Sequence, residues 1–239
     1  MTFEVVYEDN HLLAVVKPAG LLVQGDQTGD VTLLDLARDY RKRKENKPGN
    51  VFVGLVHRLD RPVSGLVLLA KTSKGASRLS EQFRSREVRK LYLAVCQTEP
   101  GARFAVGQKY HWVDRLSRPG TVEEPSAGKI QLAQTNAEIR ALGQGVLLAG
   151  LEPTTGRKHQ LRAQAALHGL PILGDRRYGA TRSFENGLAL HALALAFKHP
   201  TRSEPMLVVA PPPRVWQSFG WDPSLFRPGD DFHLGLPES

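Results

Sequence analysis

The sequence predicts a single mixed α+β domain. Several apolar segments follow one another without a helix between them, so the regular strand–helix alternation of a doubly wound fold is absent. No repeat of solenoid period and no break in composition divides the 239 residues. We therefore expect one domain over residues 1–239, in which residues 222–239, with three prolines and few apolar side chains, form a surface tail.

The first two strands are expected to form a hairpin. Residues 3–7 and 12–17 are apolar runs, and the acidic and polar residues 8–10 between them favour a turn. Pro18, Ala19 and Gly20 then end the second strand.

Three helices are expected from residues that start or stop them. Thr32 and Ser73 can each accept a hydrogen bond from a free amide in the first helical turn. Gly169 and Pro171 stop the third helix. The expected ranges are 33–43, 73–86 and 157–168.

The remaining strands are apolar runs bounded by turn residues. Residues 98–128 interrupt them with three prolines and several glycines, which predicts a looped excursion with short strands. Gly143, Gln144 and Gly145 predict a tight turn between two long strands. The expected strands are 51–56, 66–70, 91–96, 130–142, 146–152, 189–198 and 206–210, with a short segment near 215–219.

Composition restricts the partner and the compartment. The chain has 32 Lys and Arg against 24 Asp and Glu, a net charge of +8, which favours a polyanionic partner such as nucleic acid. Cys96 is the only cysteine, which excludes an internal disulfide and a thiolate cluster for zinc or iron–sulfur. The first ten residues lack the pattern of a secretory signal, and no apolar run approaches the roughly 18 residues of a membrane helix. We expect a soluble, cytoplasmic protein.

The most informative segment is 56–65, which places charge between two apolar strands. Asp60 stands between Arg58 and Arg61, so its ionised form is favoured and it can act as a nucleophile or a base. A proline and a glycine in the same segment favour a tight loop that presents a side chain rigidly. Taken alone, such a segment is more often a surface cluster of salt bridges.

A second segment, 153–162, combines a helix start with basic residues. The free amides after Gly156 suit a phosphate. Lys158 and Arg162 are four apart, which predicts a shared helix face with His159 beside them. Cations at the start of a helix oppose its dipole, so we expect an anion to compensate them, either a ligand phosphate or a carboxylate of the protein. A solvated basic helix end explains this segment alone equally well.

Two further basic runs extend the positive surface. Residues 84–90 lead into an expected strand in which Tyr92 could stack on a base or move a proton, although a tyrosine in a core is commoner. Residues 41–44 are interpreted as a solvated helix face or a nonspecific electrostatic surface.

Several familiar chemistries are excluded by missing motifs. The sequence has no phosphate-binding P-loop, no Gly-x-Gly-x-x-Gly and no His-Glu-x-x-His. Gly-x-Ser-x-Gly is also missing, since Ser64 lacks the first glycine. No pair of the eight histidines has a recognisable metal-ligand spacing, so we expect neither a metal nor a cofactor.

In their order along the chain, these motifs resemble the RluA-type family of RNA pseudouridine synthases. The resemblance runs from Tyr7 to about Pro200. It is carried by Val16-Lys17-Pro18-Ala19-Gly20-Leu21, His57-Arg58-Leu59-Asp60 with Ser64-Gly65, Lys90-Leu91-Tyr92-Leu93-Ala94, residues 155–162, Leu173 to Gly179 and Leu190-His191-Ala192.

The resemblance implies a fold, a reaction and a set of site residues. The fold would be a mixed, largely antiparallel sheet with a central catalytic cleft and flanking helices. Asp60 would be the catalytic aspartate, Tyr92 the tyrosine that stacks near the target base, and Arg162 the arginine that pairs with the carboxylate. The residues expected to contact RNA are Arg58, which can occupy the space of the flipped uridine, Arg157, Lys158 and His159.

The same resemblance implies the partners. We expect a monomer that isomerises one or more uridines in ribosomal or transfer RNA, without the accessory N-terminal RNA-binding module of many relatives. Val63 departs from the family, which usually has threonine there, and we expect altered packing of the loop with activity retained.

Two other functions use some of the same features. A non-catalytic RNA-binding or ribosome-assembly factor would need the positive charge but not Asp60, Tyr92 and Arg162 together. A metal-dependent nuclease would need more acidic residues than the sequence places around Asp60.

Overall fold

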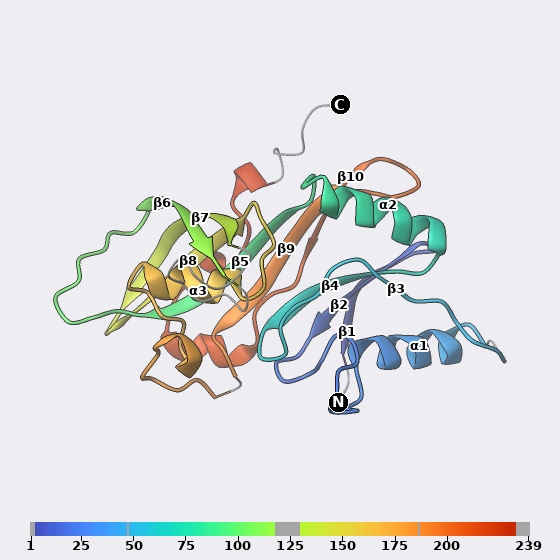
Figure 1. Cartoon of the computed structure of the whole chain (residues 1–239), viewed down its shortest axis with the longest axis horizontal. Helices are drawn as coiled ribbons and strands as arrows, with labels where there is room; N and C mark the ends of the chain where they lie inside the picture. Colours follow the sequence, from blue (N-terminus) through green and yellow to red (C-terminus); the bar gives the residue numbers. More distant parts are fainter. Residues whose placement is uncertain (1–2, 47, 118–129, 186, 233–239) are drawn as a thin grey trace.

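A ten-stranded mixed sheet organises the molecule (Figure 1). This computed structural model describes residues 3–46, 48–117, 130–185 and 187–232. The main path of the sheet runs β1-β2-β4-β9-β5-β8-β7-β6, with β3 pairing β4 and β10 pairing β9. The strands are β1 (Glu4–Glu8), β2 (Leu12–Lys17), β3 (Gly54–Leu55), β4 (Ser64–Ala70), β5 (Arg89–Gln97), β6 (Lys109–Leu116), β7 (Gln131–Gly143), β8 (Val146–Pro153), β9 (Leu190–Lys198) and β10 (Pro205–Val209).

Most of the predicted strands are confirmed, with two differences. The strand expected over 51–56 is reduced to the two residues of β3, which pair with the end of β4. In the excursion at 98–128, β6 is a full eight-residue strand, because it pairs with β7 along its whole length. Residues 118–128 of that excursion lie outside the described residues.

Three α-helices accompany the sheet: α1 (Leu33–Lys44), α2 (Ser73–Arg84) and α3 (Gln160–Leu167). Thr32 caps α1 as predicted, and Asp35 completes a reciprocal capping box. The cap of α2 is Thr72 rather than Ser73, since the Thr72 hydroxyl accepts the Gly75 amide at 3.1 Å. The part of the chain that the structure describes has no helix both long and apolar enough to cross a membrane.

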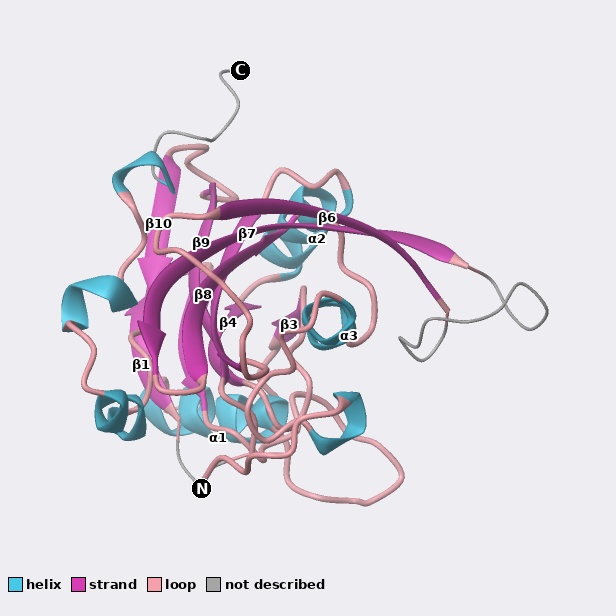
Figure 2. Cartoon of the chain, turned by 90° about the vertical axis from the view of Figure 1, so that its left-hand side faces the viewer, coloured by secondary structure: helices cyan, strands magenta, loops and turns pink. Residues whose placement is uncertain are grey.

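The helices cover both faces of the sheet. Leu33 of α1 packs in one buried cluster with Leu13 of β2, whereas Leu79 of α2 packs in another with Leu12. Because neighbouring residues of a strand point to opposite faces, α1 and α2 lie on opposite sides of β2. Figure 2 shows α2 and α3 on one side of the curved sheet and the C-terminal 3-10 helices on the other.

Residues 222–232 follow the surface and are anchored by aromatic side chains. Phe226 and Phe232 are buried in the main cluster, while most of the described side chains between them are exposed. The 3-10 helices in the described residues are η1 (Arg176–Tyr178), η2 (Arg214–Phe219), η3 (Pro223–Phe226) and η4 (Asp230–Phe232).

The centre of the sheet contains a short parallel contact. β4 and β9 pair only through Ser64 with His191 and Gly65 with Ala192, although most other pairs in the sheet are antiparallel. Gly65 has φ of +120°, and a Cβ at this position would overlap the backbone nitrogen and oxygen of Ala192. Only glycine fits here without displacing β9.

We therefore expect Gly65→Ala to destabilise the protein by about 3 kcal/mol, because the methyl group must push two central strands apart. Urea unfolding would measure the change. Gly49→Ala is the matched control, since no atom lies within 4 Å of the added Cβ, and it should change the free energy of unfolding by less than about 0.5 kcal/mol. Equal effects of the two substitutions would contradict this account of the contact.

Candidate active site

Two cavities, each of about 510 Å³, lie on opposite faces of the sheet. One is lined by Arg89, Tyr110 and Phe232, side chains that the sequence gives no chemical role. The other, called the cleft below, is lined by residues 56–60 and 153–162 and by side chains of α2 and β5. All the predicted site residues line the cleft: Arg58, Asp60, Tyr92, Arg157, Lys158, His159 and Arg162.

Asp60 lies in a tight turn after β3. Its carbonyl accepts the Val63 amide at 3.1 Å, and its side chain is 30% exposed to the cleft. Two nitrogen atoms face the carboxylate oxygen Oδ2: Nη1 of Arg162 at 3.6 Å and Nε2 of His159 at 3.7 Å. Both distances are longer than hydrogen bonds, so the carboxylate faces the charge of Arg162 without being hydrogen-bonded to it and remains open to a ligand.

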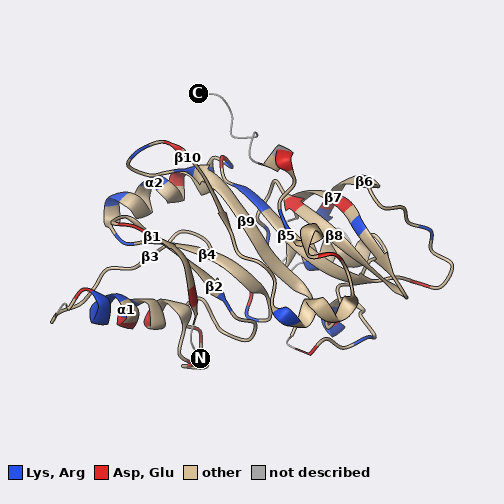
Figure 3. Ribbon diagram, turned by 180° about the vertical axis from the view of Figure 1, so that it is seen from behind, with Lys and Arg blue, Asp and Glu red and all other residues tan. Residues whose placement is uncertain are grey.

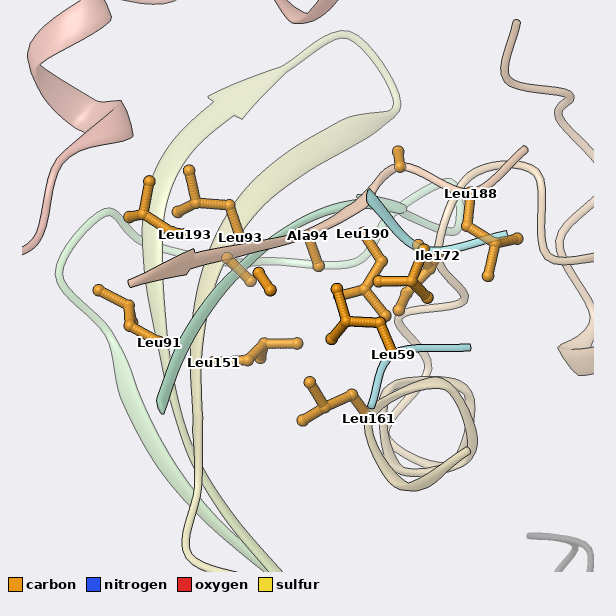
Figure 4. Packing of buried hydrophobic residues seen from close by; sticks show 14 of the residues in the cluster. Leu59, Leu91, Leu93, Ala94, Leu151, Leu161, Ile172, Leu188, Leu190 and Leu193 are labelled. Carbon is orange, nitrogen blue, oxygen red and sulfur yellow. The ribbon is translucent and has the colours of Figure 1, made fainter. Parts of the chain in front are cut away.

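The residues that precede Asp60 and Arg162 anchor both in the core. Leu59 and Leu161 are each 7% exposed and enter the main buried cluster. Figure 4 shows the two side chains pointing into the same apolar space, near Ile172 and Leu190. The apolar contact beneath the cleft therefore brings two distant chain segments together.

Arg162 is fixed by a second carboxylate that the sequence analysis did not assign. Its Nε and Nη2 donate to the two oxygens of Asp175 at 2.6 and 2.8 Å, and Asp175 is 1% exposed. Burial opposes the charge of Arg162, but the hydrogen bonds and charge of Asp175 outweigh it and raise its pKa. The remaining nitrogen, Nη1, faces Asp60, so the guanidinium is oriented before any substrate arrives.

Tyr92 enters the cleft from β5, beside an irregularity in the pairing of β5 with β9. Burial raises the pKa of the Tyr92 phenol, and the charge of Asp60 raises it further. The hydroxyl is therefore protonated at neutral pH and can donate a hydrogen bond, while the ring offers a face for stacking.

Lys17 supports the Asp60 loop from below and is fully buried. Its Nζ donates to the carbonyls of Pro18, Leu21 and Arg61 at 2.9, 2.8 and 3.1 Å. Burial lowers the pKa of Lys17 to about 7, and the charge of Asp60 opposes this shift. The contact ties the hairpin at the start of the chain to the residue after Asp60.

Two neutral histidines hold the ends of the Asp60 loop. His57 Nε2 accepts the Leu68 amide at 2.9 Å, and burial, aided by Lys90, lowers its pKa to about 3. At the other end, Nδ1 of His191 lies 2.8 Å from the Ser64 hydroxyl and Nε2 lies 2.8 Å from the Ala210 carbonyl. Burial lowers the pKa of His191 to about 4, so Nε2 donates and Nδ1 accepts.

The helix predicted over 157–168 begins later than expected. Residues 157–159 precede α3, so the prediction that Lys158 and Arg162 share a helix face is wrong. The cause is the Gln160 side chain, whose Oε1 accepts the Arg157 amide at 3.0 Å, while His159 adopts a left-handed conformation. Lys158 is exposed, whereas Arg157 donates to the Leu132 carbonyl at 3.0 Å.

The exposed fractions of two other residues correct the interpretation of Arg41 and locate Val63. Arg41 is not solvated: it is 6% exposed and donates to Glu45 and to the carbonyls of Phe52 and Lys71. The other residues of the 41–44 run are exposed at the basic end of α1 (Figure 3). Val63 is 3% exposed in the main cluster, where it packs beneath the loop.

The structure also limits what the cleft can hold. Within the described ranges, no group of three or more His, Cys, Asp or Glu side chains is arranged to bind a metal ion. The cleft instead joins one open carboxylate, a neutral phenol and several cations. This combination suits an anionic ligand that presents a reacting group to Asp60.

Known proteins of one family are similar to this chain. The family model for RNA pseudouridylate synthase matches residues 11–167. The tRNA pseudouridine synthase C of Salmonella typhi is 30% identical, with 91% of this chain and 90% of that protein aligned. The tRNA pseudouridine synthase C of Pectobacterium carotovorum is 34% identical, and the chain spans 62% of the length of that protein.

Solved structures show the same similarity. Human RNA Pseudouridylate Synthase Domain Containing 4 aligns with a TM-score of 0.73 and 25% identity over 88% of this chain and 89% of its own. Human RNA Pseudouridylate Synthase Domain Containing 1 aligns with a TM-score of 0.70 and 25% identity over 89% of this chain and 84% of its own. The fold, the cleft and these relatives agree: the chain belongs to the RluA-type family of RNA pseudouridine synthases and is an isomerase that acts on RNA.

Proposed function

We propose that Asp60 is the carboxylate with which this RNA pseudouridine synthase converts uridine to pseudouridine. The observation that supports this assignment is the Arg162 guanidinium, clamped by buried Asp175 and held 3.6 Å from a carboxylate that stays open to the cleft. An arrangement of this kind keeps a carboxylate ionised and oriented for reaction.

The reaction breaks the bond between N1 of uracil and C1′ of the ribose, turns the base and joins its C5 to C1′. C5 loses its proton and N1 gains one, so the composition is unchanged. It is an isomerisation without net oxidation or reduction. Asp60 acts on the nucleotide through its open carboxylate, either by addition or by removal of a proton from the sugar. Arg162 stabilises the negative charge of that carboxylate.

The other cleft residues handle the base and the backbone. A base must leave its helical stack to reach Asp60, and the ring of Tyr92, whose hydroxyl keeps its proton, offers it a stacking face. Arg58 is exposed in the cleft and fills the space that the base leaves. Lys158 and Arg157 bind phosphates beside it. We also propose that the protein works as a monomer.

The proposed substrate is transfer RNA. The Salmonella relative named for tRNA aligns over 90% of its length, whereas the ribosomal large subunit pseudouridine synthase D of Xylella fastidiosa aligns over 66%. The chain thus has the extent of the Salmonella tRNA enzyme, although the tRNA enzyme of Pectobacterium carotovorum aligns over 62% of its length, a share similar to that of the ribosomal enzyme.

Asp60→Asn should fold and bind RNA but lose at least about 1,000-fold in rate, because the amide cannot act as a carboxylate. Tritium release from RNA labelled at C5 of uridine measures the reaction directly. Asp39→Asn, on the exposed face of α1, is the control and should react like the unmodified protein. Normal release by Asp60→Asn would refute the assignment.

Asp175→Asn should lower both stability and rate. Arg162 would lose a buried charged partner, a change that costs about 3 kcal/mol. Its freed guanidinium would no longer be aimed at Asp60, and misplacement of this kind reduces turnover about 100-fold. Thermal unfolding and single-turnover tritium release measure the two effects. A fully active, equally stable variant would show that the clamp does not position Arg162.

Incubation with tRNA and with ribosomal RNA fragments tests the substrate. RNA lacking pseudouridine should gain it at one or a few positions in tRNA, detected by carbodiimide labelling and primer extension. Modification confined to ribosomal RNA would overturn the choice of tRNA while leaving the proposed chemistry intact.

A further inference from the structure

His159 faces the same carboxylate oxygen as Arg162. Its Nε2 lies 3.7 Å from Oδ2 of Asp60, and its side chain is only 11% exposed. Its other ring nitrogen, Nδ1, lies 3.0 Å from the hydroxyl of Tyr178. The family resemblance placed His159 among the RNA contacts, but its ring is turned inward, between Asp60 and Tyr178.

The backbone of His159 is fixed in an unusual conformation that directs the ring this way. It has φ of 56° and ψ of 20°, a left-handed geometry that side chains with a Cβ seldom adopt. Its carbonyl accepts the Ala163 amide at 3.0 Å, so the residue is locked to the first turn of α3. A conformation of this kind persists where surrounding contacts over-determine it.

Asp60 and Tyr178 together favour one tautomer of His159. A carboxylate only accepts hydrogen bonds, so the matching neutral imidazole carries its proton on Nε2, the nitrogen that faces Asp60. Nδ1 is then an acceptor. Burial raises the pKa of Tyr178, so its hydroxyl is protonated and can donate to Nδ1.

One short segment therefore holds both groups that face Asp60. Asp175 clamps Arg162, and three residues later Tyr178 orients His159. The Tyr178 ring also lies under the Arg162 guanidinium, 5.0 Å from its centroid. The two groups are supported together but differ in kind, because the guanidinium is always charged whereas the imidazole titrates near neutral pH.

The charges around His159 come from each element packed against it. Asp60 lies on the loop after β3, Arg162 on α3, Lys158 beside it in the chain and Arg177 on η1 with Tyr178. Burial, followed by the three cations, lowers the pKa of His159 below its usual 6.5, although Asp60 opposes the shift. The ring is therefore neutral at pH 7.

We propose that His159, oriented by Tyr178, is a positioning residue for Asp60 and makes turnover sensitive to acid. In its neutral form the Nε2–H group directs Oδ2 and leaves the other oxygen to the nucleotide. In its protonated form it makes an ion pair that engages the carboxylate and slows the reaction. This inference rests on the proposed role of Asp60.

Single-turnover tritium release between pH 5 and 8, with RNA dissociation constants measured alongside, tests the inference. The unmodified protein should lose rate as the pH falls below about 6.5. His159→Gln keeps a donor but cannot titrate, so it should retain about a third of the rate at pH 8 and fall less in acid. His159→Ala should lose about tenfold at pH 8. RNA affinity should change less than about threefold in both variants.

Tyr178→Phe keeps the ring beneath Arg162 and removes only the hydroxyl. It should lose about threefold to tenfold in rate at pH 8, with RNA affinity unchanged, because the imidazole tautomer is no longer fixed. His168→Gln is the matched control, since His168 ends the same helix but stacks on Trp112 outside the cleft. It should keep the rate and the pH profile of the unmodified protein.

Two outcomes would overturn the inference. An unchanged rate and pH profile in His159→Gln and His159→Ala, with weaker RNA binding, would make His159 an RNA contact. An acid profile that persists in His159→Gln would assign the titration to another group. Asp60→Asn in the same assay separates the two proposals: if it is inactive, these outcomes overturn only the role of His159, and if it is active, the proposed function fails as well.

Discussion

The buried ion pair between Arg162 and Asp175 is the interaction on which the cleft depends. Neither group could lie where it does without the other, because an unpaired charge at either position would be very costly. The pair uses two nitrogens of Arg162, Nε and Nη2, and leaves the third nitrogen, Nη1, facing Asp60. The carboxylate of Asp60 thus faces a fixed cation without being hydrogen-bonded to it, and it remains open to the cleft.

The Asp60 loop is held from three sides by one lysine and two neutral imidazoles. Lys17 uses its donors on three carbonyls, His57 accepts a backbone amide, and His191 bridges Ser64 to the Ala210 carbonyl. Lys17 also interacts electrostatically with Asp60, whereas the two imidazoles add no charge. Rigid support of this kind explains how a loop exposed to solvent can hold a reactive group in one place.

Much of the fold and part of the site follow from the sequence. The first hairpin, the Thr32 cap and the long pair β7–β8 were predicted because their signals are local. The buried partner of Arg162, Asp175, was not predicted. Nothing near Asp175 in the sequence indicates which arginine it contacts in the fold. Arg41 was assigned to solvent for the same reason: the carbonyls that bury it come from distant loops. The start of α3 was missed because the Gln160 side chain replaces the expected first turn.

The place of β9 in the sheet has a consequence for how the protein is made. β9 separates β1, β2 and β4 from β5, β8, β7 and β6, yet it is among the last strands to be synthesised. A nascent chain that ends before β9 can hold only two half-sheets, with Asp60 attached to one and Tyr92 and Arg162 to the other. Contacts of such long sequence separation form slowly. The complete cleft therefore forms only after β9 has joined the two half-sheets.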